Sequence, residues 1–309
     1  MVRGVRALVL SAVVLLVAVG CGGSSGEKVT VDATPAALKH AAQATLAKGT
    51  SKVEFSMTMT LQGHDITLPG TGAMDSANKK MSMTFDAKDL FTQLASNAPP
   101  EAAALFDQPL QVVQDGAVMY MHFPALASVM GGGKEWLKLD LAANKDASDL
   151  LGAEGGTFGS DPSSFLQFLE GAGKVTEVGK EDVRGVPTTH FSGSYTMKDV
   201  LSALPADQRD KAEQAFNHLG LSSDAETKDI PFDAWVDGAG LIRRMGITLD
   251  FASLMPAATT PLGKMTMTIE FFDFGQPVDI QVPSDDQVQD MSSLIPSGSK
   301  FSSVASSIN

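Results

Sequence analysis

The sequence Val53-Glu54-Phe55-Ser56-Met57-Thr58-Met59-Thr60-Leu61 alternates apolar and polar residues without a break. Such alternation predicts a half-buried β-strand, because successive side chains of a strand point to opposite faces of its sheet. The same pattern returns at 81–85 and at 265–271. In each stretch one face carries mostly Thr and Ser, and the other carries Met beside Phe, Val, Ile or Leu. We therefore expect three strands of one sheet.

The methionine-bearing face has two interpretations. It packs as an ordinary core, or it lines an apolar cavity, because methionine is flexible and polarizable and suits surfaces that bind varied apolar partners. From the residues alone the packed core is favoured, and the lipid-binding sheet is the alternative. If the face lines a cavity, we expect acyl chains to contact Phe55, Met57, Met59, Met81, Met83, Phe85, Met119, Met121, Phe165, Met265 and Met267.

The composition is acidic. The chain has 309 residues, with 23 lysines and arginines against 36 aspartates and glutamates, so its formal net charge is −13. Such a surface repels phosphate backbones, which argues against a nucleic-acid partner. It also stays away from an anionic bilayer unless a covalent anchor holds it there. The length allows one or two domains with ample material for a core.

The N-terminus supplies such an anchor. Arg3 and Arg6 precede an apolar run at 7–19, which is short for a bilayer span but suits a signal peptide of residues 1–20. The sequence Ala18-Val19-Gly20-Cys21 resembles a bacterial lipobox, in which the cysteine receives a diacylglycerol. We expect lipidation at Cys21 and a location on the extracytoplasmic face of the cell membrane; ordinary secretion with a leftover thiol is the competing interpretation. A single cysteine excludes an internal disulfide.

One α+β domain is predicted at residues 31–295. A flexible Gly- and Ser-rich tether at 21–30 precedes it, and a disordered Ser-rich tail at 296–309 follows it. Within the domain, Thr34-Pro35 opens a helix with an N-cap and a first-turn proline, and Gly49 closes that helix.

The remaining elements follow from periodicity and turn signals. Asp115-Gly116 is a strong hairpin signal, which indicates antiparallel pairing. A helix that begins at Asp161-Pro162 bears Phe165 on a wide apolar face. Further helices are expected at 88–95, 196–204, 205–219 and 284–295. Beyond the three opening stretches, strands are expected at 66–74, 110–114, 117–122, 136–139, 174–181, 186–195, 230–237, 241–251 and 278–282.

A search for catalytic and metal-binding motifs finds none. No two of the five histidines lie within four positions of each other, so metal-ligand spacing is missing, and we interpret His190 as a solvated strand residue. Gly22–Gly26 matches the pattern of a nucleophile elbow at Ser24, but that motif needs a buried strand before it. We expect a binding protein without enzymatic activity, cofactor or metal.

Two stretches resemble the LppX/LprAFG lipoproteins of bacteria. They are Val183-Arg184-Gly185-Val186-Pro187-Thr188-Thr189-His190-Phe191 and the hairpin from Pro231 to Arg244, which contains Asp237-Gly238-Ala239-Gly240. The resemblance implies a LolA-like fold, in which a strongly curved antiparallel sheet forms an incomplete barrel with helices packed on its concave side. It also implies an apolar cavity for acyl chains and no catalytic residues.

The sequence thus predicts a membrane-anchored envelope lipoprotein that binds lipid or lipoglycan acyl chains and carries or presents them, with a membrane transporter as a candidate partner. Two rivals stay open. One is an envelope interaction or sensor module whose sheet is fully packed, and the other is a hydrolase with a dispersed site. An empty apolar interior would favour lipid binding, whereas a filled interior would favour docking.

Overall fold

The computed structural model describes residues 33–61, 63–94, 108–122, 134–143, 174–203, 209, 223–254 and 262–291. The predicted signal peptide, Cys21 with its tether, the helix that carries Phe165 and the C-terminal tail lie outside these residues. So does the helix expected at 205–219, apart from Arg209. Among the described helices, none is long and apolar enough to cross a membrane.

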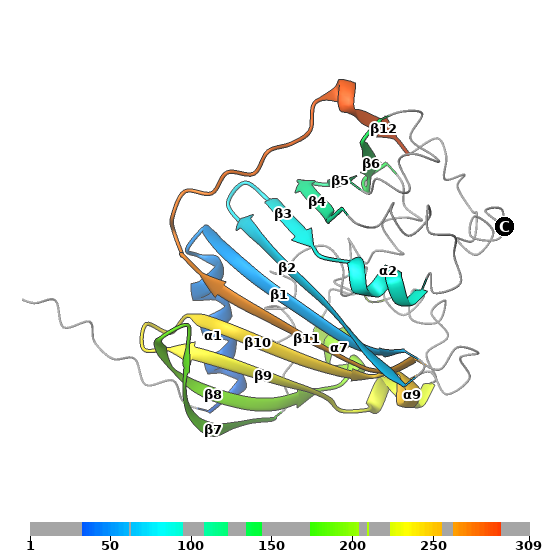
Figure 1. Cartoon of the computed structure of the whole chain (residues 1–309). Helices are drawn as coiled ribbons and strands as arrows, with labels where there is room; N and C mark the ends of the chain where they lie inside the picture. The colour runs from blue at the N-terminus through cyan, green and yellow to red at the C-terminus, as the bar shows by residue number, and fades with distance from the viewer. Residues whose placement is uncertain are drawn as a thin grey trace, which may run out of the picture.

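A single 12-stranded sheet dominates the fold, with strand order β12-β6-β5-β4-β3-β2-β1-β11-β10-β9-β8-β7 (Figure 1). Every neighbouring pair is antiparallel except β12 and β6. The strands are β1 (Thr50–Leu61), β2 (His64–Asp75), β3 (Lys80–Phe85), β4 (Leu110–Asp115), β5 (Val118–His122), β6 (Trp136–Asp140), β7 (Lys174–Val183), β8 (Val186–Tyr195), β9 (Ile230–Asp237), β10 (Ile242–Asp250), β11 (Leu262–Phe272) and β12 (Val288–Asp290).

The sheet is open, and its two halves meet at β1 and β11, which lie far apart in the sequence. The prediction of one large, mostly antiparallel sheet is confirmed. Two of the three alternating stretches, 53–61 and 265–271, lie at this seam, where Met57 is paired with Met267 and Met59 with Met265. How the helices sit relative to the curvature of the sheet stays a prediction.

Helix α1 (Pro35–Leu46) begins as its sequence predicts, with the Thr34 hydroxyl accepting a hydrogen bond from the Ala37 amide at 3.2 Å. Its buried stripe joins the residues of the sheet in one apolar cluster. Thr45, near its end, donates to the Ala41 carbonyl and accepts from the Ile242 amide at 2.9 Å, which fastens the helix to the start of β10. The helix ends at Leu46, three residues before the glycine expected to close it.

The other helices among the described residues are short. They are α2 (Lys88–Leu94), α7 (Met197–Ala203), α9 (Phe251–Leu254) and the 3-10 helices η2 (Ser223–Thr227) and η3 (Asp285–Gln287). The first two confirm the helices expected at 88–95 and 196–204, with ends that differ by one residue. The third follows β10 directly and begins at Phe251, which the sequence predicted as the last residue of the strand.

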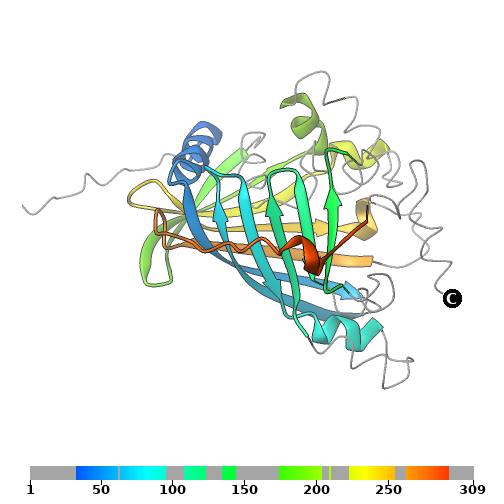
Figure 2. The same cartoon turned by 90° about the horizontal axis from the view of Figure 1, so that it is seen from above.

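The C-terminal region differs from its prediction. Residues 278–284 form no strand, and in the described part of the helix expected at 284–295 there is a single 3-10 turn followed by β12, which pairs in parallel with β6. Figures 1 and 2 show the chain leaving β11, which lies in the middle of the sheet, and running to the edge of the sheet to reach β6. Ser284 and Gln287 form the capping box that their spacing predicts. The edge of β6, however, has unpaired backbone groups, and residues 288–290 pair with it as a strand instead of continuing the helix.

Candidate functional site

The strand registers place the predicted contact residues on one face of the sheet. Directly opposed residues of paired strands share a face. Phe55 lies opposite Ile269 of β11 and Gly70 of β2, and Gly70 lies opposite Phe85 of β3. Followed across the sheet in this way, one face, which we call the methionine face, carries Phe55, Met57, Met59, Met81, Met83, Phe85, Met119, Met121, Met265 and Met267.

Burial divides these residues into two groups. Met81, Met83, Met119 and Met267 are buried, with at most 6% of each exposed. The others are half-buried: Phe55, Met57, Met59, Phe85, Met121 and Met265. The methionine face therefore carries both packed and partly accessible apolar side chains, and the interpretation of the face as a lining for acyl chains stays a prediction.

The packed positions belong to two clusters. The larger joins α1 to β1–β3 and β8–β11 and includes Met81, Met83 and Met267. The smaller consists of Met119, Leu139 and Leu141, with Met121 packed against it. The structure thus brings most of the predicted residues together, and it places Met119 and Met121 of β5 in the separate, smaller cluster. Phe165 lies outside the described residues.

Glycines let large side chains of the methionine face lie flat across neighbouring strands. A Cβ on Gly70 would lie 2.7 Å from Cδ1 of Phe85, and a Cβ on Gly72 would overlap the Ser82 carbonyl oxygen and the Met83 sulfur. Any larger residue at either position would therefore push these side chains away. Phe85 in turn meets Phe55 edge to face, with ring centroids 5.5 Å apart.

A pocket of about 650 Å³ lies at one end of the methionine face. It sits between the end of α1, the β2–β3 hairpin and the β4–β5 turn. Buried Met74 and Met81 contribute to its wall, while Ser76, Ala77 and Lys79 are exposed. Its size falls within the usual range of small-molecule sites. The lining is Leu46, Ala47, Gly49, Met74, Asp75, Ser76, Ala77, Lys79, Lys80, Met81, Gln114 and Gly116.

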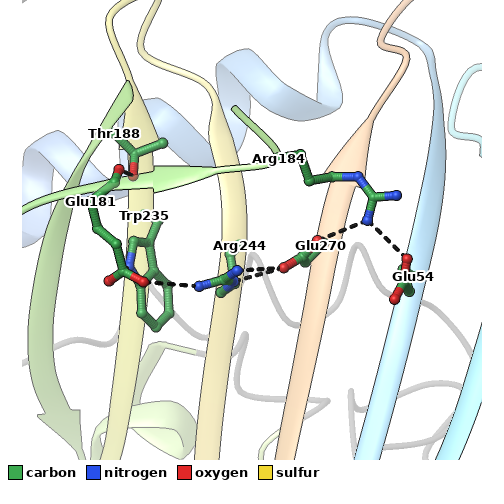
Figure 3. Close-up of polar contacts among 7 residues, drawn as sticks. All are labelled: Glu54, Glu181, Arg184, Thr188, Trp235, Arg244 and Glu270. Carbon is green, nitrogen blue, oxygen red and sulfur yellow. Dashed lines mark hydrogen bonds and ion pairs between the residues drawn. The ribbon is translucent and has the colours of Figure 1, made fainter. Parts of the chain in front are cut away.

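The opposite face of the same strands, the outer face, carries a network of charges (Figure 3). Arg184 in the β7–β8 turn donates to Glu54 of β1 at 2.8 Å and to Glu270 of β11 at 2.9 Å. Arg244 of β10 donates to the other oxygen of Glu270 at 2.8 Å and to Glu181 of β7 at 3.3 Å. One network therefore joins the β7–β8 hairpin to the central strands.

These contacts set the charge states within the network. Burial alone would raise the pKa of Glu270, but hydrogen bonds from Arg184 and Arg244 outweigh it and hold that pKa below its ordinary value. Hydrogen bonds to Glu54 and Glu270 raise the pKa of Arg184. Both arginines form ion pairs with carboxylates, so we interpret the network as structural. We call these residues, Glu54, Glu181, Arg184, Arg244 and Glu270, the clasp.

His190 differs from its expected solvated state. Its Nε2 lies 2.8 Å from Oδ1 of Asp233, and its ring stacks on Trp235 with centroids 4.3 Å apart. The side chain is 19% exposed. Sequence reasoning missed this pairing because the two residues lie on different strands and meet only through the β8–β9 register. Among the described residues, no three His, Cys, Asp or Glu side chains gather to hold a metal ion.

The chain is similar to known proteins in sequence and in fold. No family model matches it. It is 25% identical over 276 residues to an uncharacterized 31.2 kDa protein of Streptomyces griseus encoded between rplA and rplJ, which covers 85% of this chain and 81% of that protein.

Solved structures offer a second comparison. The chain is similar to lipoprotein LppX of Mycobacterium tuberculosis, with a TM-score of 0.42 and 13% identity over 80% of this chain and 100% of LppX. It is also similar to LprF of Mycobacterium bovis, with a TM-score of 0.40 and 15% identity over 81% of this chain and 96% of LprF. These are the lipoproteins that the sequence resembles. At such TM-scores the likeness carries no functional argument, so what the chain binds has to follow from its own residues.

Proposed function

We propose that this protein is an envelope lipoprotein that binds the acyl chains of a lipid or lipoglycan on its methionine face and carries or presents them at the membrane. The observation that carries the proposal is the alignment of methionine and phenylalanine side chains from β1, β3, β5 and β11 on one face, next to a pocket of about 650 Å³. Half-buried methionines suit such a role because they adapt to ligands of varied shape.

The energetic demand of lipid transfer is large. Each CH₂ that leaves a bilayer needs about 0.8 kcal/mol of replacement burial, so a two-chain lipid with roughly 30 such groups needs on the order of 20 kcal/mol. The pocket alone holds a headgroup or a drug-sized molecule. The chains of a larger lipid would therefore continue along the methionine face, past Met57 and Met59, which are two of its half-buried residues.

Anchoring is the second part of the proposal. A diacylglycerol on Cys21 would hold this acidic chain beside a membrane that its charge would otherwise avoid. The mass of the mature protein tests this part directly. A mass that fits a lipid-modified N-terminus at Cys21 supports it, and the unmodified mass of a secreted chain contradicts it.

The first experiment is native mass spectrometry of the chain from Gly22 onward, purified from a host membrane fraction without detergent. We expect a stoichiometric lipid that survives gentle ionisation. A mass without ligand, repeated after incubation with diverse lipids, would instead support the docking module. That rival has an observation of its own, since Met81, Met83 and Met267 are enclosed by protein.

A pair of neighbouring substitutions tests the face itself. Met57→Asp puts a charge on the methionine face, whereas Thr58→Asp puts the same charge on the outer face of the same strand, where Thr58 meets the Thr67 hydroxyl at 3.0 Å. We expect the first to abolish lipid retention and the second to preserve it. Met57→Gln, which is milder, keeps the test valid if the charged variant fails to fold. Equal retention in Met57→Gln, Thr58→Asp and the unmodified chain would place the ligand elsewhere.

A further inference from the structure

The chain leaves the middle of the sheet after β11 and reaches the edge of the sheet as β12. We call residues 277–283, which lie between these two strands, the strap. Within it, half-buried valine or isoleucine residues at 278, 280 and 282 alternate with exposed polar residues at 279 and 281. One side of the strap therefore rests against the protein. Figure 2 shows the strap running across the strands of the sheet, so it cannot extend their ladders.

The backbone of the strap is unpaired. No backbone hydrogen bond joins it to another residue that the structure describes. Its two ends are Pro277 and Pro283, and proline has no amide hydrogen to donate. Movement of the strap therefore breaks no backbone hydrogen bond within the described part of the chain.

The end of the strap next to β11 is firmly fastened. The Gly275 amide donates to the Thr50 carbonyl at 2.9 Å, and the Thr50 hydroxyl donates to the Gln276 carbonyl at 2.7 Å. Lys52 donates to Asp273 at 2.9 Å. These contacts fix the start of the strap to β1, which is a central strand of the sheet.

The other end is held by fewer ordered groups. We call β12 together with Met291 the latch. The latch pairs with β6 over three residues, and the Met291 amide adds a hydrogen bond to the Lys138 carbonyl at 2.8 Å. Asp290 lies 3.8 Å from the Lys138 ammonium, and both side chains are partly exposed, so this ion pair is weak. The side chain of Met291 is buried. Such a short edge strand is the kind of element that opens locally.

The strands that the latch holds form a separate unit. The smaller apolar cluster draws all its members from β4, β5 and β6 or from Leu141, which directly follows β6. The larger cluster, as far as the structure describes it, includes no residue of these three strands. Within the sheet, two ladders join this β4–β6 unit to its neighbours: β3 with β4, and β6 with β12. The unit can therefore move without disrupting the main core.

We propose that the strap and the latch gate the methionine face. While the latch pairs with β6, the β4–β6 unit is closed. When the latch releases, the unit turns about the β3–β4 ladder and acyl chains reach Met119 and Met121 from this edge of the sheet. The strap keeps the released latch near β6, so that it binds again. The gate rests on the proposed function, and it adds the edge of the sheet at which the lipid enters.

A disulfide that locks the latch tests the gate. The chain from Gly22 onward has no cysteine, because Cys21 is the only one. Lys138→Cys with Asp290→Cys places two thiols on register partners of β6 and β12. We measure the uptake of a pyrene-labelled phospholipid from phosphatidylcholine vesicles. The oxidised form should take up the lipid roughly tenfold more slowly than the reduced form.

A second disulfide serves as the control for the first. Thr58→Cys with Thr67→Cys links β1 to β2 on the outer face, where the two hydroxyls lie 3.0 Å apart. It adds the same kind of cross-link away from the latch. Its uptake rate should be the same in the oxidised and reduced forms.

A measurement without lipid tests whether the unit opens. In a chain that carries Leu139→Cys, the thiol is buried in the smaller cluster, and its rate of modification by a thiol reagent reports opening. Met291→Pro removes the hydrogen bond to Lys138 and should speed this modification roughly tenfold or more. Gln281→Pro, in the unpaired strap, should leave the rate unchanged. Asp290→Lys, which opposes Lys138, keeps the test valid if Met291→Pro fails to fold.

The outcomes separate the gate from the proposed function. Met83→Cys, which reports on the main cluster, should stay protected in Met291→Pro. Equal acceleration at both reporters, or none at Leu139→Cys, would overturn the independent movement of the unit and leave lipid binding intact. Equal uptake by the locked and reduced forms would overturn the gate. Failure of every form to take up lipid would overturn the proposed function and the role of the latch in lipid entry, while the modification rates still report whether the unit opens.

Discussion

The two faces of the central strands are held by different forces. On β1, Val53 and Phe55 face the apolar cluster, whereas Glu54 and Lys52 face the ion pairs of the outer face. Apolar contacts have no preferred direction, so a face that they hold can rearrange when a ligand enters. Hydrogen-bonded ion pairs require fixed geometry, so a face that they hold keeps its shape.

The difference suggests a division of labour within one sheet. The clasp formed by Arg184, Glu270 and Arg244 joins strands from β7 to β1. Under the proposed function, the clasp would maintain the sheet while the methionine face adapts to a ligand. Substitutions at matched positions of the two faces test this contrast.

The largest effect is expected from adjacent phenylalanines that point to opposite faces. Phe271 is 1% exposed in the main cluster, whereas Phe272 is half-buried beneath the Arg184 guanidinium, 4.0 Å from its ring centre. Phe271→Ala should cost about 3–5 kcal/mol of unfolding free energy. Phe272→Ala should cost only about 1 kcal/mol, mainly its contact with the arginine. Urea unfolding measures both, and equal losses would refute the assignment of the core to one face.

Two strand glycines give the next largest contrast. On the methionine face, the Cβ of Gly72→Ala would overlap the Met83 sulfur and the Ser82 carbonyl, and the strain should cost about 1–3 kcal/mol. On the outer face, a Cβ at Gly246 meets nothing closer than 3.9 Å, so Gly246→Ala should be neutral or stabilise by about 0.5–1 kcal/mol. Thermal unfolding of the two variants distinguishes them. A stable Gly72→Ala would mean that the methionine face has room at this end.

The charge network should contribute a pH-dependent part of the stability. The pKa of Glu270 is lowered in the folded state, so the unfolded chain binds the proton more readily. Its contribution is present above the unfolded pKa of about 4.3 and is lost as the pH falls through the lower folded value. Glu270→Gln should therefore lose about 1–2 kcal/mol at neutral pH and little at pH values below the folded pKa.

The measurement for Glu270 is the difference in unfolding free energy between the variant and the unmodified chain, followed from neutral to acidic pH. Taking the difference removes the titration of the other carboxylates. A difference that stays constant with pH would show that Glu270 acts through packing. Phe272→Ala serves as the control, because it removes an uncharged neighbour of the same network.

The sequence predicts the methionine face well because alternation has a strict period of two. Once β1, β3 and β11 are strands of one sheet, Met57, Met83 and Met267 can share a face only if the registers agree, and they do. The registers themselves do not follow from local pattern. The β1–β11 pairing joins residues more than 200 positions apart, and nothing near Met57 indicates Met267 as its partner.

The sequence alone predicts neither the pocket nor the clasp, and the reason is the same for both. Gln114 reads in the sequence as an ordinary residue of a hairpin strand, and its place beside Met81 depends on the β3–β4 register. Arg184 reads as a turn residue, and its reach to Glu54 depends on how the β7–β8 hairpin lies over the outer face. Long-range pairing decides both, whereas strand alternation reports only which side chains share a face.

The smallest effect is expected from an isolated ion pair on the outer face. Lys52 donates to Asp273 at 2.9 Å, and about half of each side chain is exposed. A double-mutant cycle with Lys52→Met and Asp273→Asn should give a coupling energy of at most about 0.5 kcal/mol. Asparagine suits position 273, whose φ of 51° lies in the left-handed region. The corresponding cycle for Arg184 and Glu270 should give a larger coupling, since Glu270 is only 17% exposed and is held by a second arginine. If the two cycles agree, the outer face is a set of independent surface pairs, and the rigidity assigned to it has to come from the backbone of the sheet.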